Sequence, residues 1–306
     1  MTGTKSDALP SIKTKEAIPM KKWCLFLGLY FCLALAVGCA GQPSDVPQAV
    51  EPETDSDTDM VVQVTDGPPW CVTCRIVDGT ETGQLLLAEQ GDAAASVYTL
   101  SMDSLTCEPQ FIEPLRSGQL INVYYESFTE AWPMNFGGVS AIEILEVGFD
   151  DRCSLYLQVL EDLWEADSGL NNGVEVIGMD LSQTSLSPSE QAAVGWIFAG
   201  RHGAEVVDGT LNELVEQGWI TATPLSISGS GTDLSEPKHY FYEWENGCHF
   251  SITEQPMEGT YSLVPVTFDA QKWRSSLGAY WFCDCTAVQS ALGEWSDYSI
   301  GSEVIS

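Results

Sequence analysis

The sequence predicts an α+β protein in which a small all-β module precedes a mixed domain. Between residues 62 and 148, short apolar runs alternate with turn residues at the spacing of short strands. From residue 149 the apolar period changes from two residues to about 3.6, the period of a helix. After residue 235 strand-like runs return. We therefore expect a small β-barrel or sandwich over 62–148 and an α+β domain with an antiparallel sheet over 149–306.

Local signals set the expected elements of both parts. Capping boxes at Ser187–Glu190 and Thr210–Glu213 predict that helices begin there. Asn246-Gly247 lies between two strand-like runs and predicts a tight hairpin. The expected strands are 71–77, 83–88, 97–102, 120–125, 139–147, 174–179, 204–207, 238–244, 248–255, 261–268, 278–286 and 297–304, with a further extended segment at 219–222. The expected helices are 152–166, 188–200 and 211–217.

Residues 20–38 have the pattern of an export signal. Lys21 and Lys22 precede an apolar run that is shorter than the roughly 20 residues of a membrane-spanning helix. The small residues that end the run, followed by Cys39, resemble the lipobox of bacterial lipoproteins. This resemblance implies that Cys39 is lipidated and holds the protein on the outer face of the cell membrane. Ala36 stands where the lipobox most often has Leu, so an ordinary signal peptide cut near Gly38 is the alternative.

The segments on either side of the signal are expected to lie outside the fold. Because the signal is complete from Met20, residues 1–19 are interpreted as an extension that a different start codon would remove. Residues 39–61 are rich in Pro, Asp, Glu, Ser and Thr and lack apolar periodicity. Such a segment cannot bury enough surface to offset its ordering entropy, so we expect a disordered acidic tether.

The charge balance limits the classes of partner. Five of the 12 basic residues and two of the 44 acidic residues lie before Cys39, which leaves 7 basic and 42 acidic side chains, a net charge of about −35. Such a chain repels nucleic acid and anionic headgroups. We therefore exclude nucleic acid as a partner and expect the membrane to be reached only through the lipid on Cys39.

Seven cysteines remain after the signal and the lipidated residue are removed, so they cannot all pair within one chain. Three interpretations stay open: buried thiols, disulfides, or a thiolate zinc site. Disulfides would join Cys74 to Cys71 or Cys107, and Cys248 to Cys283 or Cys285. Zinc would require Cys71 and Cys74 to meet Cys283 and Cys285, whose i, i+2 spacing places both sulfurs on one strand face.

Segments in both parts of the chain resemble lipoproteins of Gram-positive gut bacteria. Val97–Leu100, Leu115–Tyr125 and Trp132-Pro133 with Ala141–Ile144 resemble small OB-like β-barrel modules. Phe268–Ser275 and Leu277–Tyr280 resemble the second part of uncharacterised two-part lipoproteins. The resemblance implies an OB-like barrel followed by an α+β domain, and it brings no catalytic residue.

Three further groups are candidates for a site. Tyr240, Tyr242 and Trp244 share a strand face, which either binds a ligand such as a glycan or packs in the core. Lys272, Trp273 and Arg274 either form an anion pocket or pair with local carboxylates. Cys248 with His239 would be a nucleophile and base, but no third group or oxyanion hole is indicated.

These observations support a lipid-anchored envelope protein that binds a ligand or an envelope partner without catalysis. No catalytic residue is assigned, since no nucleophile elbow, phosphate-binding loop or zinc-protease motif is present. The alternative is an exported metal or thiol-redox protein that uses Cys71/Cys74 and Cys283/Cys285. A cell-wall hydrolase with paired carboxylates is a third hypothesis, although acidic residues are too numerous to single out a pair.

Overall fold

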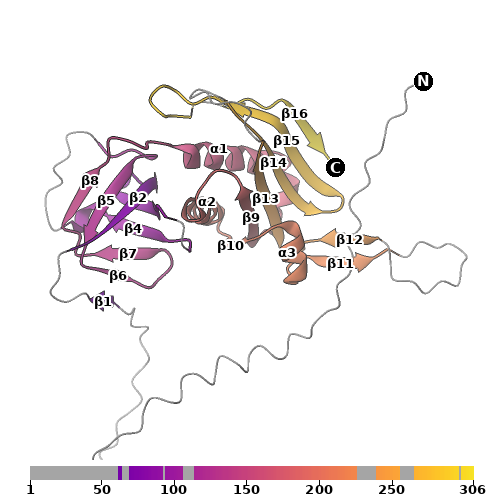
Figure 1. Ribbon diagram of the computed structural model, residues 1–306. Helices are drawn as coiled ribbons and strands as arrows, with labels where there is room; N and C mark the ends of the chain where they lie inside the picture. The colour runs from indigo at the N-terminus through magenta and orange to yellow at the C-terminus, as the bar shows by residue number, and fades with distance from the viewer. Residues whose placement is uncertain are drawn as a thin grey trace, which may run out of the picture. The chain divides into compact units, whose positions relative to one another are not determined.

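The structure, a computed structural model, describes residues 61–63, 69–91, 94–105, 114–225, 239–255, 265–295 and 298–306. The predicted start extension, the predicted signal, Cys39, Cys107 and the predicted tether up to residue 60 lie outside the described residues. The fold is mixed, with more strand than helix and with sheets that are mainly antiparallel (Figure 1). The described helices include none that is both long and apolar enough to cross a membrane.

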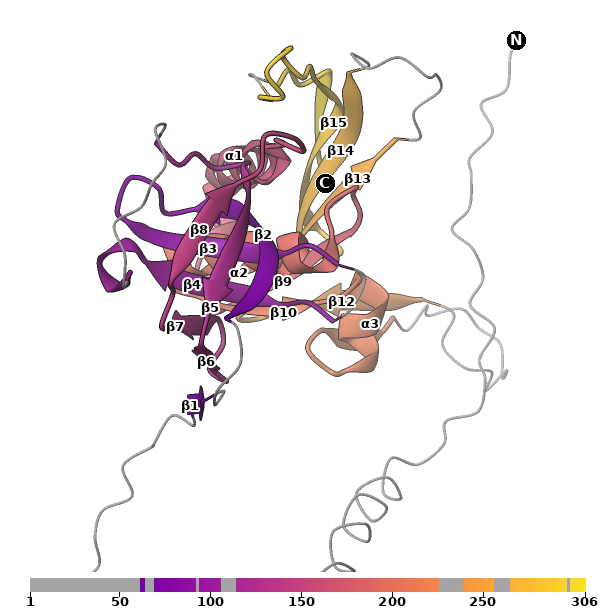
Figure 2. The same ribbon diagram turned by 60° about the vertical axis from the view of Figure 1, so that its left-hand side comes forward.

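The first sheet contains eight strands in the order β1-β6-β7-β4-β3-β2-β5-β8 (Figure 2). Apart from the parallel pair β4 and β7, its neighbours run antiparallel. Its strands are β1 Val61–Gln63, β2 Trp70–Asp78, β3 Gln84–Glu89, β4 Val97–Ser101, β5 Leu120–Tyr125, β6 Ser127–Thr129, β7 Met134–Gly137 and β8 Ala141–Ile144, with a 3-10 turn at Met102–Ser104.

The first sheet has residues packed on both faces, but its described strands do not close into a barrel. One face holds a cluster that includes Ile76, Leu87, Tyr98 and Phe136. The strands at the two ends of the order, β1 and β8, each pair with one neighbour only. The closed OB-like barrel expected over 62–148 is therefore not confirmed, whereas most of the expected strands are present.

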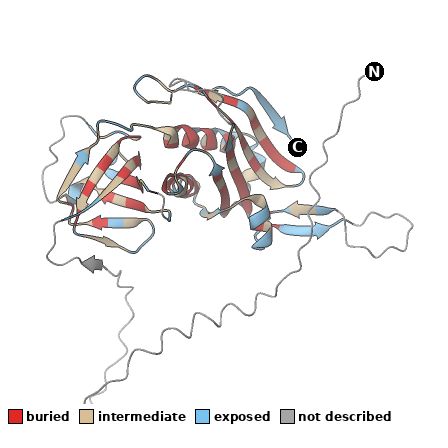
Figure 3. Cartoon of the chain, in the orientation of Figure 1, coloured by how far each residue is buried: buried red, intermediate tan, exposed pale blue. Residues whose placement is uncertain are grey.

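Two helices pack against the opposite face of this sheet. They are α1 Arg152–Glu165 and α2 Pro188–Arg201. Val77, Leu86 and Val97 of the first sheet belong to the same buried cluster as the inner residues of both helices. That cluster continues into the second sheet, and Figure 3 shows its buried residues along both helices and the central strands.

The second sheet has the order β10-β9-β13-β14-β12-β11, and β15 and β16 extend it from β14. Because β9 pairs in parallel with both β10 and β13, this sheet is mixed rather than purely antiparallel. Its strands are β9 Val176–Gln183, β10 Glu205–Asp208, β11 Thr221–Pro224, β12 Tyr240–Glu243, β13 Gly247–Glu254, β14 Val266–Ser275, β15 Gly278–Ala287 and β16 Ser302–Ile305, with a 3-10 turn at Ser168–Asn171 before β9.

The hairpin predicted at Asn246-Gly247 is wrong. Strand β12 pairs with β11 and β14, whereas β13 pairs with β9 and β14. The Trp244 indole lies so close to Gly247 that a Cβ there would be 2.0 Å from the ring. The carbonyl of Asn246 accepts hydrogen bonds from the backbone of Glu175 and Val176, which directs the chain into β13 beside β9.

The short helix α3, Leu211–Glu216, covers the other face of the second sheet. Leu214 of α3 packs with Val176, Ile220 and Trp244 in a separate buried cluster. Gly178 of β9 permits this approach, because a Cβ there would lie 2.8 Å from both the Leu214 and the Trp244 side chains.

A buried ion pair joins the first sheet to α2. Arg75 of β2 donates through Nε to Glu190 of α2 at 2.5 Å, and the two side chains are 12% and 8% exposed. The Nη1 of Arg75 donates to the carbonyls of Gly118, Gly148 and Asp150. Glu190 also accepts from the backbone N–H of Ser187, which completes the capping box of α2.

We expect Arg75→Ala to lower the free energy of unfolding by about 3–5 kcal/mol, because it leaves a buried carboxylate and three carbonyls without their partner. Arg116→Ala is the matched control, since Arg116 and Glu294 form an ion pair with side chains nearly half exposed. Arg116→Ala should lower the free energy of unfolding by about 1 kcal/mol or less. Urea unfolding of both variants measures the difference, and equal effects would contradict the role of Arg75.

The Glu190 carboxyl should also contribute a pH-dependent part of the stability. Burial alone would raise its pKa, but the backbone N–H of Ser187 and the Arg75 guanidinium outweigh burial and lower the pKa. The contribution is therefore full above the unfolded-state pKa of about 4.3 and is lost as the pH falls through the folded-state pKa. In urea unfolding at several pH values, Glu190→Gln should differ most from wild type near neutral pH and progressively less below about pH 5. A difference independent of pH would oppose this assignment.

Candidate functional site

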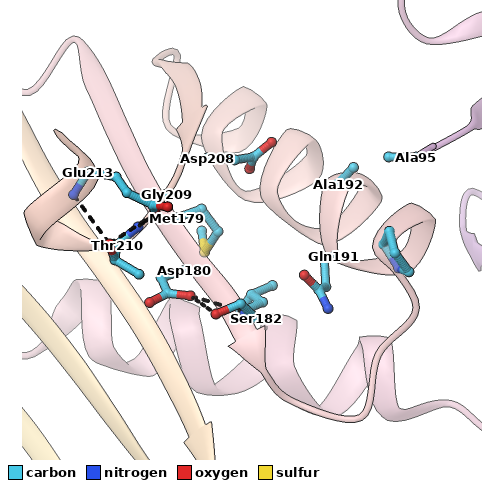
Figure 4. A pocket seen from close by; sticks show the side chains of 12 residues that line it. Ala95, Met179, Asp180, Ser182, Gln191, Ala192, Asp208, Gly209, Thr210 and Glu213 are labelled. Atoms are coloured by element: carbon cyan, nitrogen blue, oxygen red, sulfur yellow. Dashed lines mark hydrogen bonds between the residues drawn. The ribbon is translucent and has the colours of Figure 1, made fainter. Parts of the chain in front are cut away.

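A pocket lies where β9 and β10 end. Strand β9 continues into α2 on one face of the second sheet, whereas β10 continues into α3 on the other face. In sheets with parallel strands, such a divergence at the carboxyl ends opens a crevice that often binds ligands. The pocket has a volume of about 390 Å³ (Figure 4). Its lining residues are Ala95, Met179, Asp180, Leu181, Ser182, Pro188, Gln191, Ala192, Asp208, Gly209, Thr210 and Glu213.

The polar side chains of this pocket mainly offer hydrogen-bond acceptors. The Ser182 hydroxyl donates to Asp180 at 2.6 Å, and the Thr210 hydroxyl donates to Glu213 at 2.9 Å (Figure 4). Asp180 receives hydrogen bonds on Oδ1 and Glu213 on Oε2, and the second oxygen of each carboxylate accepts none from the part of the chain that the structure describes. Asp208 accepts no side-chain hydrogen bond from the described residues. A ligand that donates hydrogen bonds therefore fits the pocket better than one that accepts them.

The acidic lining of the pocket favours a cation, although the pKa shifts of two of its carboxyl groups are opposite in direction. Partial desolvation raises the pKa of Asp208, whereas the Thr210 backbone N–H and hydroxyl lower that of Glu213. No basic or aromatic side chain is among the lining residues. Within the described ranges, no three His, Cys, Asp or Glu side chains are grouped so that they could hold a metal ion. The carboxylates are thus suited to an extended cation with several N–H donors.

The six described cysteines carry free thiols. Cys74, Cys153, Cys248 and Cys285 are buried, whereas Cys71 is exposed and Cys283 is partly exposed. Burial raises the pKa of Cys248 and of Cys285 to about 12. The expected disulfides between described cysteines are not formed, and the expected partner Cys107 lies outside the described residues.

A β-bulge separates the two thiols of Cys283-Asp284-Cys285. Phe268 pairs with Cys285 and Ala270 with Phe282, so Asp269 faces two residues of β15. Asp284 takes a positive φ of 53° at this bulge, and its backbone N–H donates to the Asp269 carboxylate. The expectation that both sulfurs share one face is therefore wrong, since Cys285 joins the core and Cys283 is half-buried. The zinc site predicted from these cysteines and the Cys71/Cys74 pair has no support in the described geometry.

Lys272 and Arg274 bind the backbone that follows α1 instead of lining an anion pocket. The fully buried Lys272 ammonium donates to the carbonyls of Trp164, Ala166 and Asp167 and to the Asn171 amide oxygen, at 2.5–3.2 Å. Arg274 donates to the carbonyls of Leu170, Asn172 and Glu245. The expected carboxylate partners are also absent from these described contacts. Both cations thereby hold the segment that follows α1 against the second sheet.

The aromatic stripe is divided between core and surface. Trp244 is 1% exposed and packs beneath α3, with Trp273 at the edge of the same cluster. Tyr240 is exposed and Tyr242 partly exposed, and their ring centroids are 6.2 Å apart. No described pocket includes either tyrosine or Trp244.

Cys248 and His239 do not form a nucleophile–base pair. The Cys248 thiol donates to the carbonyl of Trp273 at 3.4 Å inside the core. His239 lies exposed just before β12, which is not a neighbour of β13.

Sequence reasoning missed the acidic pocket because Asp180 and Asp208 come together only through the parallel pairing of β9 and β10. The turn after β10 and its capping box at Thr210–Glu213 were the available signals.

A scan of the sequence against protein-family models gave no match, and a search of curated proteins gave none.

Alkylation of the native protein should modify Cys71 fastest, because its thiol is exposed on the strand face opposite to the buried Cys74. Cys74, Cys153, Cys248 and Cys285 should react only after denaturation, since burial suppresses both access and thiolate formation. Peptide mass spectrometry before and after denaturation measures this order. Rapid native labelling of Cys248 would contradict the buried arrangement.

Lys272→Met should lower the free energy of unfolding by about 2–4 kcal/mol, because four buried acceptors lose their donor. Chemical denaturation measures the loss. Lys272→Arg is a second variant that keeps the charge but cannot reproduce the compact set of contacts. If Lys272→Met left the stability unchanged, the ammonium would not hold the end of α1.

Proposed function

We propose that this chain is a lipid-anchored envelope protein whose folded part binds a small organic primary amine at the carboxyl ends of β9 and β10. The acceptor-rich lining of the 390 Å³ pocket carries the proposal. Three carboxylates there have oxygens that accept no hydrogen bond from the described residues, while the Ser182 and Thr210 hydroxyls already donate to neighbours. The apolar side chains of Met179, Leu181 and Ala192 provide a surface for a hydrocarbon stem.

The chemistry favours an amine with N–H donors over a quaternary ammonium. Quaternary ammonium groups are usually recognised by aromatic faces, and this pocket has no aromatic lining residue. A primary ammonium instead donates up to three charge-assisted hydrogen bonds, which suits separated carboxylates. The net charge of the chain would also attract cations to the surface.

The anchoring part of the proposal rests on the sequence of residues 20–39. We also propose a relation to two-part lipoproteins with an OB-like module. It rests on the resemblance of residues 97–100, 115–125, 132–133, 141–144, 268–275 and 277–280. The alternative of thiol-redox or metal chemistry has less support, because one member of each cysteine pair is buried.

Calorimetric titration with putrescine is the test of the ligand class. We expect binding that weakens as salt is added, and no binding of 1,4-butanediol, which lacks the charge. Asp208→Asn and Asp180→Asn should each weaken binding by about tenfold, the effect of losing one charge-assisted contact. Asp103→Asn is the matched control, since Asp103 is exposed on the turn after β4. Absence of putrescine binding, or equal weakening by the control, would overturn the amine site.

Cys39→Ser should move the exported protein from the membrane fraction to the soluble fraction, because the thioether-linked lipid cannot form. Cell fractionation with immunodetection measures this change. A membrane-bound Cys39→Ser protein would contradict lipid anchoring and leave the amine test unaffected.

A further inference from the structure

Arg152 differs from every other basic side chain that the structure describes. Arg75, Arg116, Arg201, Lys272 and Arg274 each donate at least one hydrogen bond to a carboxylate or carbonyl. The Arg152 guanidinium donates none to the described residues, and its Nε is fully buried without a partner. Its side chain is only 16% exposed. Because Nε is shielded from solvent, the donors that a ligand could reach are the terminal nitrogens Nη1 and Nη2.

The Arg152 guanidinium is held in place by contacts other than hydrogen bonds. It stacks over the Trp295 ring with its central carbon 4.6 Å from the ring centroid. The nearest carboxylate oxygens are Asp150 Oδ2 at 3.8 Å and Glu254 Oε1 at 3.7 Å, which are too far for hydrogen bonds. Asp150 is itself fixed, since its Oδ1 accepts from the Trp295 indole N–H at 2.7 Å, while its Oδ2 accepts no hydrogen bond from the described residues.

Arg152 and Asp150 line a second pocket with a volume of about 220 Å³. Two cationic side chains, Arg75 and Arg152, and two anionic ones, Asp150 and Glu190, are among its lining residues. Of these four, Arg75 and Glu190 already bind each other. The pocket is therefore charge-balanced within a strongly acidic chain, and one unpaired donor group lies beside one unpaired acceptor.

We propose that this pocket binds a small zwitterion, a free α-amino acid, with its carboxylate on Arg152 and its ammonium on Asp150. Opposite charges less than 4 Å apart in the protein match the adjacent carboxylate and ammonium of such a molecule. A simple anion would face the two carboxylates, and a simple cation would face the two guanidinium groups. The volume is below that of pockets for drug-sized ligands, which restricts the ligand to a small molecule.

The test is a thermal-unfolding titration of the purified full chain with alanine, serine and each of the other common L-amino acids. At least one should raise the unfolding midpoint with a saturable dependence on concentration. Its amide, which lacks the carboxylate, and its deaminated acid, which lacks the ammonium, should not. Absence of a saturable shift for all of them, or an equal shift by the deaminated acid, would overturn the proposal and leave a pocket filled by water.

Variants separate this pocket from the amine site. Arg152→Gln and Asp150→Asn should each weaken amino-acid binding by about tenfold or more, while putrescine binding stays as in wild type. Arg116→Gln is the matched control, because Arg116 also lies over an aromatic ring, that of Phe149, but lines neither pocket. If Arg152→Gln does not fold, Arg152→Lys keeps the charge without the planar fork and should still weaken binding. Unchanged affinity in the folded variants would overturn the assignment.

Discussion

The buried contact between Arg75 and Glu190 is the constraint on which the arrangement of both pockets depends. It fixes the start of α2 against β2, and the residues at that start contribute to both pockets. The same guanidinium also donates hydrogen bonds to the carbonyls of Gly118, Gly148 and Asp150. These bonds hold the loop before β5 beside the start of α1. Gly118 permits this closeness, since it has a φ of 89° and a Cβ there would be 2.7 Å from Asp151. A buried pair of this kind specifies position more than it adds stability.

The elements that the sequence predicts well are those governed by neighbouring residues. Helices α2 and α3 begin where their capping boxes predict, because those bonds join residues three apart along the chain. Strand β5 has the predicted bounds, with Ile121, Val123 and Tyr125 buried on one face as alternation requires. Short β6 and β7 were not expected, since three or four residues give too little periodicity to detect.

What the sequence could not predict depends on pairing between distant residues. The turn chemistry at Asn246-Gly247 is real, yet packing of Trp244 on Gly247 and pairing of β13 with β9 override it. The bulge at Asp284 reverses the face of Cys283 in a way that spacing alone does not reveal. Lys272 likewise has partners about 100 residues away, at the end of α1, so its role could not be inferred from the acidic residues near it in sequence. In each case tertiary contact decides which of several locally acceptable arrangements forms.

Basic residues are scarce in this chain, so the contacts that each one makes are informative about its role. Six of the seven that follow Cys39 are described, and five of them hold backbone carbonyls or carboxylates within the fold. In a chain with so many acidic side chains, a guanidinium could readily find a carboxylate at hydrogen-bond distance. Arg152 instead lies on Trp295 with two carboxylates just beyond that distance, beside a pocket. Stacking and these near approaches orient the group but leave its donors for a molecule in the pocket, as a preorganised binding site requires.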